Sequence, residues 1–333
     1  MATIIGDNSA EYLPGTANRD IIDGRGGDDT IDGFGGNDDL YGGSGDDVIY
    51  GGAGDDDLYG GSGVNDLFGG SGFDWFIMSG RANSSSDDWI GDFQFDIDSI
   101  DVSSWGVSDF SQLKALLRTD STGSAWLNAA YNGYSHYLTI DGVAATELIS
   151  SDFIYSNAGA RNETGTAFID TLFGSRYADV LSGGGAADTL LGGIGADVLN
   201  GDGGADHLIG GAGADILRGG AGADSLTGNA GADVFDFNAV SESPAGAGRD
   251  IITDLTLDVD VIDVHGIDAR SDIAGNQDFR WIGAADFTAA GQLNYYYAGG
   301  NTIISGNTDA DAQAEFQVAV IGRFIPIASD FVL

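Results

Sequence analysis

Single apolar residues recur every nine positions along two stretches of the chain, and the residues around them follow one pattern. In the clearest repeats, 51–59 and 210–218, glycines stand at positions one, two and four, an aspartate at position six and the apolar residue at position eight. Glycines at these places allow backbone conformations that a Cβ disfavours, which favours a turn. An apolar residue flanked by more polar ones is typical of a very short strand with one inward side chain. Each repeat therefore predicts a turn followed by a short strand.

The apolar positions keep their register throughout both stretches. They are Ile22, Ile31, Leu40, Ile49, Leu58, Leu67 and Phe76 in the first array, and Leu172, Leu181, Leu190, Leu199, Leu208, Leu217, Leu226 and Phe235 in the second. A fixed period is the sequence signature of a solenoid, in which repeats stack to bury a continuous core. With two repeats per coil, successive coils stack as parallel strands. We therefore predict an all-β chain with two tandem parallel β-rolls, at about 6–78 and 165–237.

Each array is followed by the same order of Asp-rich strand segments, so the chain is predicted to be a duplication. The matching segments are Asp98-Ser-Ile-Asp101-Val with Asp260-Val-Ile-Asp263-Val, and Ser151-Asp152-Phe-Ile-Tyr155 with Asp330-Phe-Val-Leu333. We expect two domains, 1–155 and 164–333. In each, a β-sandwich-like cap, at 79–155 and 238–333, shields the last coil of the roll as solenoids require.

Burial of the apolar positions alone does not account for an ordered roll. One buried Leu or Ile stabilises by roughly 1.5–3 kcal/mol, whereas ordering the backbone of a repeat costs about 1–2 kcal/mol per residue. Backbone hydrogen bonds between coils recover about 0.5–1.5 kcal/mol each. We therefore expect a bound cation to supply the remainder, because metal binding then contributes directly to folding.

The charge of the chain points to the same cation. There are 52 acidic residues against 12 basic ones, giving a net charge of −40, which makes nucleic acid a poor partner. A content of 42% apolar and 10% aromatic residues argues against a disordered acidic segment. Because the chain has no cysteine and only three histidines, its ligands are carboxylate and carbonyl oxygens. These favour Ca²⁺ over Mg²⁺, which prefers rigid octahedral geometry and holds its waters.

The candidate ligands are the aspartates at position six. Turns two repeats apart are neighbours on one edge of a roll, so a Ca²⁺ between them takes an aspartate from each, as with Asp38 and Asp20. The predicted repeat ligands are Asp20, Asp29, Asp38, Asp47, Asp56, Asp74, Asp179, Asp188, Asp197, Asp206, Asp215, Asp224 and Asp233, with backbone carbonyls of turn residues such as Gly42, Gly51, Gly192, Gly210 and Gly219. Asn65 replaces the carboxylate in one repeat, and the repeats 15–23 and 165–173 lack most glycines. We expect these two end repeats to be empty or poorly occupied.

The pattern Gly-Gly-x-Gly-x-Asp-x-apolar-x resembles the calcium-binding repeat of the RTX (repeats-in-toxin) family. This resemblance implies a β-roll that binds several Ca²⁺ ions between alternate repeats. The segments after the arrays resemble the C-terminal module of serralysin-type proteases, in two copies and without His-Glu-x-x-His. That resemblance implies a further calcium site at Glu242 and Asp250. Asp88 is the counterpart of Asp250 in the first half, where Arg81 lies near the place of the acidic partner.

The ends of the chain suggest a route of export. The first residues have neither the basic nor the apolar region of a signal peptide, and no apolar run approaches the roughly 18 residues of a membrane span. The ending Asp330-Phe-Val-Leu333 resembles the acidic and hydrophobic tail of type I secretion substrates. We therefore predict a secreted, extracellular calcium-binding protein that uses type I secretion machinery and folds outside the cell, where Ca²⁺ is millimolar.

The sequence shows no catalytic constellation, because the three histidines are isolated, and we predict that the chain is not an enzyme. Two alternatives remain open. One is an extracellular polysaccharide-binding module or adhesin that uses Trp281 and the aromatic run 295–297. The other is a hydrolase with an unrecognised site. Asp309-Ala-Asp311 resembles the start of an EF-hand loop but lacks its glycine and closing glutamate, so a hairpin turn is predicted there.

Overall fold

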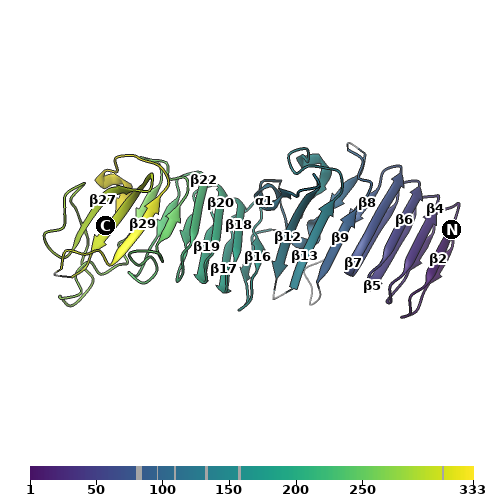
Figure 1. Ribbon diagram of the computed structural model, residues 1–333, viewed down its shortest axis with the longest axis horizontal. Helices are drawn as coiled ribbons and strands as arrows, with labels where there is room; N and C mark the ends of the chain where they lie inside the picture. Colours follow the sequence, from purple (N-terminus) through teal and green to yellow (C-terminus); the bar gives the residue numbers. More distant parts are fainter. Residues whose placement is uncertain (80–84, 96, 109, 132–133, 157–158, 310) are drawn as a thin grey trace. The chain divides into compact units, whose positions relative to one another are not determined.

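A computed structural model describes residues 1–79, 85–95, 97–108, 110–131, 134–156, 159–309 and 311–333 (Figure 1). The chain divides into two compact units, Met1–Ala158 and Gly159–Leu333. Each unit contains a stack of short parallel strands followed by a region with antiparallel strands. Among the residues that the structure describes, no helix is long and apolar enough to cross a membrane.

The strands of the first roll lie where the repeats predict them, except that one strand, Asp57–Ser71, continues through the turn between two repeats. They are β1 (Thr3–Ile5), β2 (Tyr12–Thr16), β3 (Ile21–Asp23), β4 (Thr30–Phe34), β5 (Asp39–Ser44), β6 (Val48–Ala53), β7 (Asp57–Ser71) and β8 (Trp75–Ile77). Alternate strands pair in parallel, so that β3 pairs with β5 and β4 with β6. One coil therefore contains two repeats, as predicted. The two stacks of strands form the two faces of the roll.

The second roll repeats this arrangement, and Figure 1 shows it as a ladder of green arrows. Its strands are β15 (Asn162–Thr164), β16 (Thr171–Phe173), β17 (Val180–Gly185), β18 (Thr189–Ile194), β19 (Val198–Gly203), β20 (His207–Ala212), β21 (Ile216–Arg218), β22 (Ser225–Ala230) and β23 (Val234–Asp236). The odd-numbered strands of this series form one sheet and the even-numbered strands the other.

The apolar position of every repeat from Ile22 to Phe76 and from Leu172 to Phe235 is completely buried, with 0% of its surface exposed. The residues on either side of it in the strand are mostly half-buried, as the pattern iBi of β3 and β21 illustrates. The core of each roll is thus a single file of apolar side chains from each sheet. This confirms the predicted fold class, an all-β chain with parallel β-rolls.

The cap of the first unit continues the two sheets of its roll. On one sheet, β9 (Ser86–Ile90) pairs in parallel with β7, β13 (Tyr134–Ile140) pairs with β9, and β12 (Ala125–Tyr131) and β11 (Arg118–Thr119) follow antiparallel. On the other, β10 (Ser99–Asp101) pairs with β8 and β14 (Phe153–Ile154) with β10. The helix α1 (Phe110–Leu116) lies in this cap and buries Leu113.

The second cap is built in the same order. On one sheet β24 (Asp250–Ile252) pairs with β22, and β29 (Phe316–Val320), β28 (Asn301–Asn307), β27 (Gln292–Ala298) and β26 (Arg280–Trp281) follow. On the other, β25 (Val261–Asp263) pairs with β23 and β30 (Phe331–Val332) with β25. The last strand of each unit follows a short 3₁₀ turn, η2 (Ser150–Asp152) or η3 (Ala328–Asp330), whose aspartate accepts the N–H of Ile149 or Ile327. The two units therefore share their construction to the last strand.

The burial pattern predicts that adjacent residues of one strand differ sharply in their contribution to stability. Leu199 is fully buried and Val198 only half-buried. In saturating Ca²⁺, Leu199→Ala is expected to lower the free energy of unfolding by about 2–5 kcal/mol, because it leaves a cavity in the core. The control Val198→Ala is expected to cost less than about 1 kcal/mol. Equal losses in urea denaturation contradict the single-file core.

Candidate metal centres

The position-six aspartates form ladders along the edges of each roll. The backbone N–H of Asp20 donates to Oδ1 of Asp38 at 2.7 Å, and that of Asp38 donates to Oδ1 of Asp56 at 2.8 Å. Partners in the roll are 18 residues apart, so each ladder skips alternate repeats. Each residue of a ladder is called a rung below, and the predicted pairs of aspartates are neighbouring rungs.

Each unit has two such ladders. In the first unit they run through Asp20, Asp38, Asp56, Asp74 and Asp98, and through Glu11, Asp29, Asp47, Asn65 and Asp88. In the second they run through Asp170, Asp188, Asp206, Asp224 and Asp250, and through Asp179, Asp197, Asp215, Asp233 and Asp260. Sequence reasoning did not place Asp98 and Asp260 on the ladders, because the steps to them are 24 and 27 residues and break the period.

The second carboxylate oxygen of most rungs is buried without a hydrogen-bond partner among the described residues. This holds for Oδ2 of Asp29, Asp38, Asp47, Asp56, Asp74, Asp88, Asp188, Asp197, Asp206, Asp215, Asp224, Asp233 and Asp250. An unsatisfied buried group costs about 1–3 kcal/mol, and more when it is charged. Every one of these oxygens belongs to a predicted ligand, and a cation beside them removes the cost.

Seven of these oxygens lie beside the first glycine of their own turn, together with a carbonyl oxygen from the next coil; they belong to Asp29, Asp38, Asp47, Asp56, Asp188, Asp197 and Asp206. A Cβ on Gly33 would lie 2.5 Å from Asp38 Oδ2 and 2.6 Å from the Gly51 carbonyl oxygen. A Cβ on Gly192 would lie 2.6 Å from Asp197 Oδ2 and 2.5 Å from the Gly210 carbonyl oxygen. The carbonyls of Gly42, Gly192 and Gly219 face Gly24, Gly174 and Gly201 in the same way. These converging hard oxygens fit Ca²⁺.

Burial is the main electrostatic influence on the ladder carboxyls. It raises the pKa of Asp38 and Asp56 to about 6, and that of Asp197 and Asp206 to about 7. The N–H of the preceding rung lowers each value, and the negative charges of neighbouring rungs raise it. Without a cation, these four carboxyls therefore take up protons at a higher pH than an exposed aspartate does.

The predicted pair Glu242 and Asp250 lies at the end of one ladder of the second roll. The N–H of Asp224 donates to Asp250 Oδ1 at 2.8 Å, and Asp250 Oδ2 has no hydrogen-bond partner among the described residues. Burial raises the pKa of Asp250 to about 8, with further contributions from the charges of Asp224 and Glu242. Glu242 also accepts the N–H of Asn238 at 2.7 Å. The structure thus brings the two carboxylates close enough to interact.

The corresponding rung of the first roll is different. The Nδ2 group of Asn65 donates to Asp88 Oδ1 at 2.8 Å, so an amide lies where the other rungs present a carboxylate oxygen. Burial raises the pKa of Asp88 to about 7. Arg81, which the sequence analysis placed near this site, lies outside the described residues.

Asp92 and Asp254 have a role that sequence reasoning missed. Asp92 accepts the N–H groups of Gly69 and Gly70 at 2.9 and 3.0 Å. Asp254 accepts those of Gly228 and Asn229 at 3.0 and 2.7 Å. Each therefore fixes the last turn of its roll. The available signal was the common spacing of Asp88 with Asp92 and of Asp250 with Asp254.

Asp20 and Asp179, both predicted ligands, differ from the other rungs. The N–H and hydroxyl of Thr16 each donate to Asp20 Oδ2 at 2.7 Å, and the N–H of Ala2 donates to Asp20 Oδ1. The N–H and hydroxyl of Ser175 donate to Asp179, whose Oδ1 also accepts the N–H of Arg161. Both oxygens of each carboxylate are therefore hydrogen-bonded within the protein.

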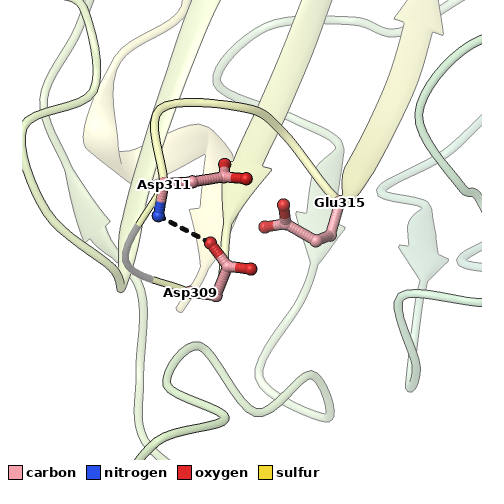
Figure 2. A group of neighbouring side chains, drawn as sticks. All are labelled: Asp309, Asp311 and Glu315. Atoms are coloured by element: carbon pink, nitrogen blue, oxygen red, sulfur yellow. Dashed lines mark hydrogen bonds between the residues drawn. The ribbon is translucent and has the colours of Figure 1, made fainter.

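A separate acidic cluster lies in the loop between β28 and β29. Figure 2 shows Asp309, Asp311 and Glu315 gathered there, with candidate ligand atoms within 4.8 Å of one another. The N–H of Asp311 donates to Asp309 at 2.8 Å, and the N–H of Thr308 donates to Glu315 at 2.7 Å. Because β28 and β29 are antiparallel neighbours, the predicted hairpin turn is confirmed.

The fold and the ladders define a calcium-binding β-solenoid. Four stretches, 14–49, 41–76, 164–199 and 200–235, match the family profile of the RTX calcium-binding nonapeptide repeat. The two arrays of this chain are therefore RTX calcium-binding repeats, as the sequence predicts.

Solved structures that resemble part of the chain include two subunits of the Azotobacter vinelandii mannuronan C5-epimerase. The AlgE6R3 subunit is 25% identical with a TM-score of 0.31, and the match covers 46% of this chain and 82% of that one. The AlgE6R2 subunit is 21% identical with a TM-score of 0.30, covering 47% and 94%. No curated protein sequence matches the chain.

The raised pKa values predict an unusual pH dependence for the metal-free protein. Folded carboxyls such as Asp56 and Asp206 titrate at about 6 and about 7 instead of 3.8, so the folded state binds more protons than the unfolded chain in this range. Stability without metal is therefore greatest at acid pH and falls as the pH rises through 6 to 7. In EDTA, the β-sheet circular dichroism signal is expected to be stronger at about pH 5 than at about pH 7.5. An equal signal at both values contradicts the protonated ladder.

Proposed function

We propose that this chain is a secreted, non-catalytic calcium-binding protein whose rolls fold when Ca²⁺ fills the ladders outside the cell. The observation that carries the proposal is the series of buried Oδ2 atoms without hydrogen-bond partners among the described residues. Bound Ca²⁺ supplies positive charge to these oxygens and to the turn carbonyls opposite them. The chain's own contribution is to hold both sets of oxygens in register through the N–H bonds of the ladder.

Coupling of folding to calcium follows from the charge of the chain. In the cytosol, where Ca²⁺ is scarce, the net charge of −40 opposes compaction, and each ladder carboxylate loses hydration when it is buried. Outside the cell, binding to the folded state alone stabilises that state by mass action. The protein therefore stays unfolded before export and folds after it.

Export through type I secretion machinery before folding is part of this proposal. In the folded unit, β30 pairs with β25 and buries Phe331, which is 7% exposed, and Asp330, which is 1% exposed. An exporter that recognises Asp330-Phe-Val-Leu333 has access to this segment in the unfolded chain. The likeness to two serralysin-type C-terminal modules supports the same route. The pair Glu242 and Asp250 is proposed as an additional calcium site of the second module.

The non-catalytic role is supported by the position of the carboxylates. The ladder aspartates are buried and accept main-chain N–H groups from the neighbouring rung, as Asp47 does from Asp29. A carboxylate held in this way serves binding and folding, because a substrate has no access to its oxygens.

Removal and replacement of the metal test the proposal. At about pH 7.5, EDTA-treated protein is expected to lose most of its β-sheet circular dichroism signal, and millimolar Ca²⁺ is expected to restore it. Millimolar Mg²⁺ is expected to restore much less, because it resists dehydration and requires octahedral geometry. A full β-sheet signal in EDTA that is unchanged by Ca²⁺ overturns the proposed function.

A second candidate function is polysaccharide binding by the second cap. Trp281 stacks on Tyr295 with ring centroids 5.9 Å apart, and Arg323 lies 5.2 Å above the ring of Tyr297. Tyr296 and Tyr297 are 42% and 41% exposed. Partly exposed rings beside an arginine suit the stacking of sugar rings. If the protein is extracellular, as the main proposal states, polysaccharides are available to bind to this surface.

The carbohydrate surface predicts a selective effect of aromatic substitutions. On a polysaccharide panel in Ca²⁺, Tyr297→Ala or Trp281→Ala is expected to weaken binding at least about tenfold, because each removes a stacking ring. Tyr12→Ala, which removes a ring that is 58% exposed in the first unit, serves as the control. Absence of binding by the parent protein, or equal loss in the control, rejects this candidate.

A further inference from the structure

The second residue of the turn adopts two different backbone conformations among the repeats. In most repeats it is left-handed, and this holds even where the residue is not glycine, with φ of 69° at Arg25 and 66° at Phe34, Asp202 and Asn229. A non-glycine residue in this region costs about 1–3 kcal/mol, so the surrounding turn must enforce it. Among the non-glycine residues that the structure describes, only Asp258 shares this conformation outside the second turn position.

In four left-handed turns, the N–H group of the second residue donates to an aspartate other than the one four residues later; these residues are Arg25, Phe34, Gly70 and Asn229. Phe34 donates to Asp32 at 3.1 Å and Arg25 donates to Asp23 at 3.1 Å, each two residues back along the chain. Asp38 follows Phe34 by four residues, and its Oδ2 has no hydrogen-bond partner among the described residues. Left-handed second residues precede all position-six aspartates with a bare Oδ2: Asp29, Asp38, Asp47, Asp56, Asp74, Asp188, Asp197, Asp206, Asp215, Asp224 and Asp233.

In three repeats the second residue is threonine or serine, and its φ is not in the left-handed region. Thr16, Thr166 and Ser175 turn their N–H groups toward the aspartate four residues later, and their hydroxyls donate to the same carboxylate. The Oδ2 of that aspartate is thereby satisfied by the protein itself. Charged carboxylates gain about 1.5–3 kcal/mol from each such bond.

We call a rung closed when hydrogen bonds within the protein satisfy its second carboxylate oxygen. Closed rungs occur at the same places in both units. The first rungs of the second roll are Asp170 and Asp179, and those of the first roll are Glu11 and Asp20, where Glu11 accepts the N–H of Asp7 at 2.7 Å. One ladder of each unit also ends on a closed rung. Asp98 accepts the N–H of Gln94 at 2.8 Å, and Asp260 that of Thr256 at 2.7 Å.

We propose that the conformation of the second turn residue decides which ladder aspartates bind Ca²⁺. This inference rests on the proposed calcium-dependent function. When the second turn residue is left-handed, Oδ2 of the aspartate four residues later is available to bind the cation. A threonine or serine with ordinary φ places an N–H and a hydroxyl there instead, and the rung needs no metal. Asp20 and Asp179 then bind no Ca²⁺ through Oδ2, and each roll begins with a coil that its own side chains hold in place.

A single substitution tests this rule in the first roll. Phe34 is 51% exposed, so its replacement removes no core packing. Phe34→Thr is expected to abandon the left-handed conformation, which a β-branched residue strongly disfavours, and to donate to Asp38. Isothermal titration is expected to show at least one Ca²⁺ ion fewer than in the parent protein. The control Phe34→Gly is expected to keep the full number, and Asp38→Asn gives the reference for a lost ligand.

The converse substitution tests the rule by gain. Ser175→Gly combined with Tyr177→Gly gives the turn at Asp179 the glycines of a regular repeat, and at least one additional Ca²⁺ ion is expected to bind. This variant also decides the matter if Phe34→Thr fails to fold. Equal calcium numbers for Phe34→Thr and Phe34→Gly, or no gain in the folded Ser175→Gly/Tyr177→Gly variant, overturn the inference alone. Absence of Ca²⁺ binding by the parent protein overturns the proposed function itself.

Discussion

The burial of carboxylates in register is the constraint on which the rest of the structure depends. Each rung gives one oxygen to the N–H of the preceding rung and turns the other toward the first glycine of its turn, as Asp38 does at Gly33. The first oxygen fixes the spacing of the coils. The second is favourable only with a proton or a cation beside it, since a bare buried charge is costly. The same side chain therefore makes the roll regular and, in the proposed function, makes its folding depend on calcium.

The chain limits this dependence by varying its turns. Thr16 and Ser175 replace the cation with an N–H and a hydroxyl, while Asn65 donates its amide to Asp88. Asp92 and Asp254 fix the final turns through pairs of N–H groups. In one ladder of each unit, the regular repeats thus lie between rungs that hydrogen bonds complete, and the caps continue both sheets beyond them. A solenoid built in this way has defined ends without a change of fold.

The repeat made much of this predictable from sequence. A period of nine residues places Ile22 opposite Leu40 and brings Asp20 beside Asp38, because two repeats close one coil. Asp88 and Asp250, beyond the arrays, were predicted only through the resemblance to serralysin-type modules, and Asp98 and Asp260 were missed, since loops of other lengths lead to them. The left-handed conformation of Phe34 and Arg25 was not predictable either, because side chains of this size ordinarily avoid it. The stacking of the coils sets the backbone conformation of both residues, and the intrinsic φ preference of a residue does not predict this effect.

Amide hydrogen exchange along the ladders tests the central claim most directly. The N–H groups of rungs such as Asp38, Asp56, Asp197 and Asp206 are donors only when the coils are stacked. At about pH 7.5, these amides are predicted to be protected in Ca²⁺ and to exchange in EDTA at rates close to those of an unfolded chain. Protection of the same amides in EDTA, equal to that in Ca²⁺, would show that the ladders form without the cation and would contradict the account.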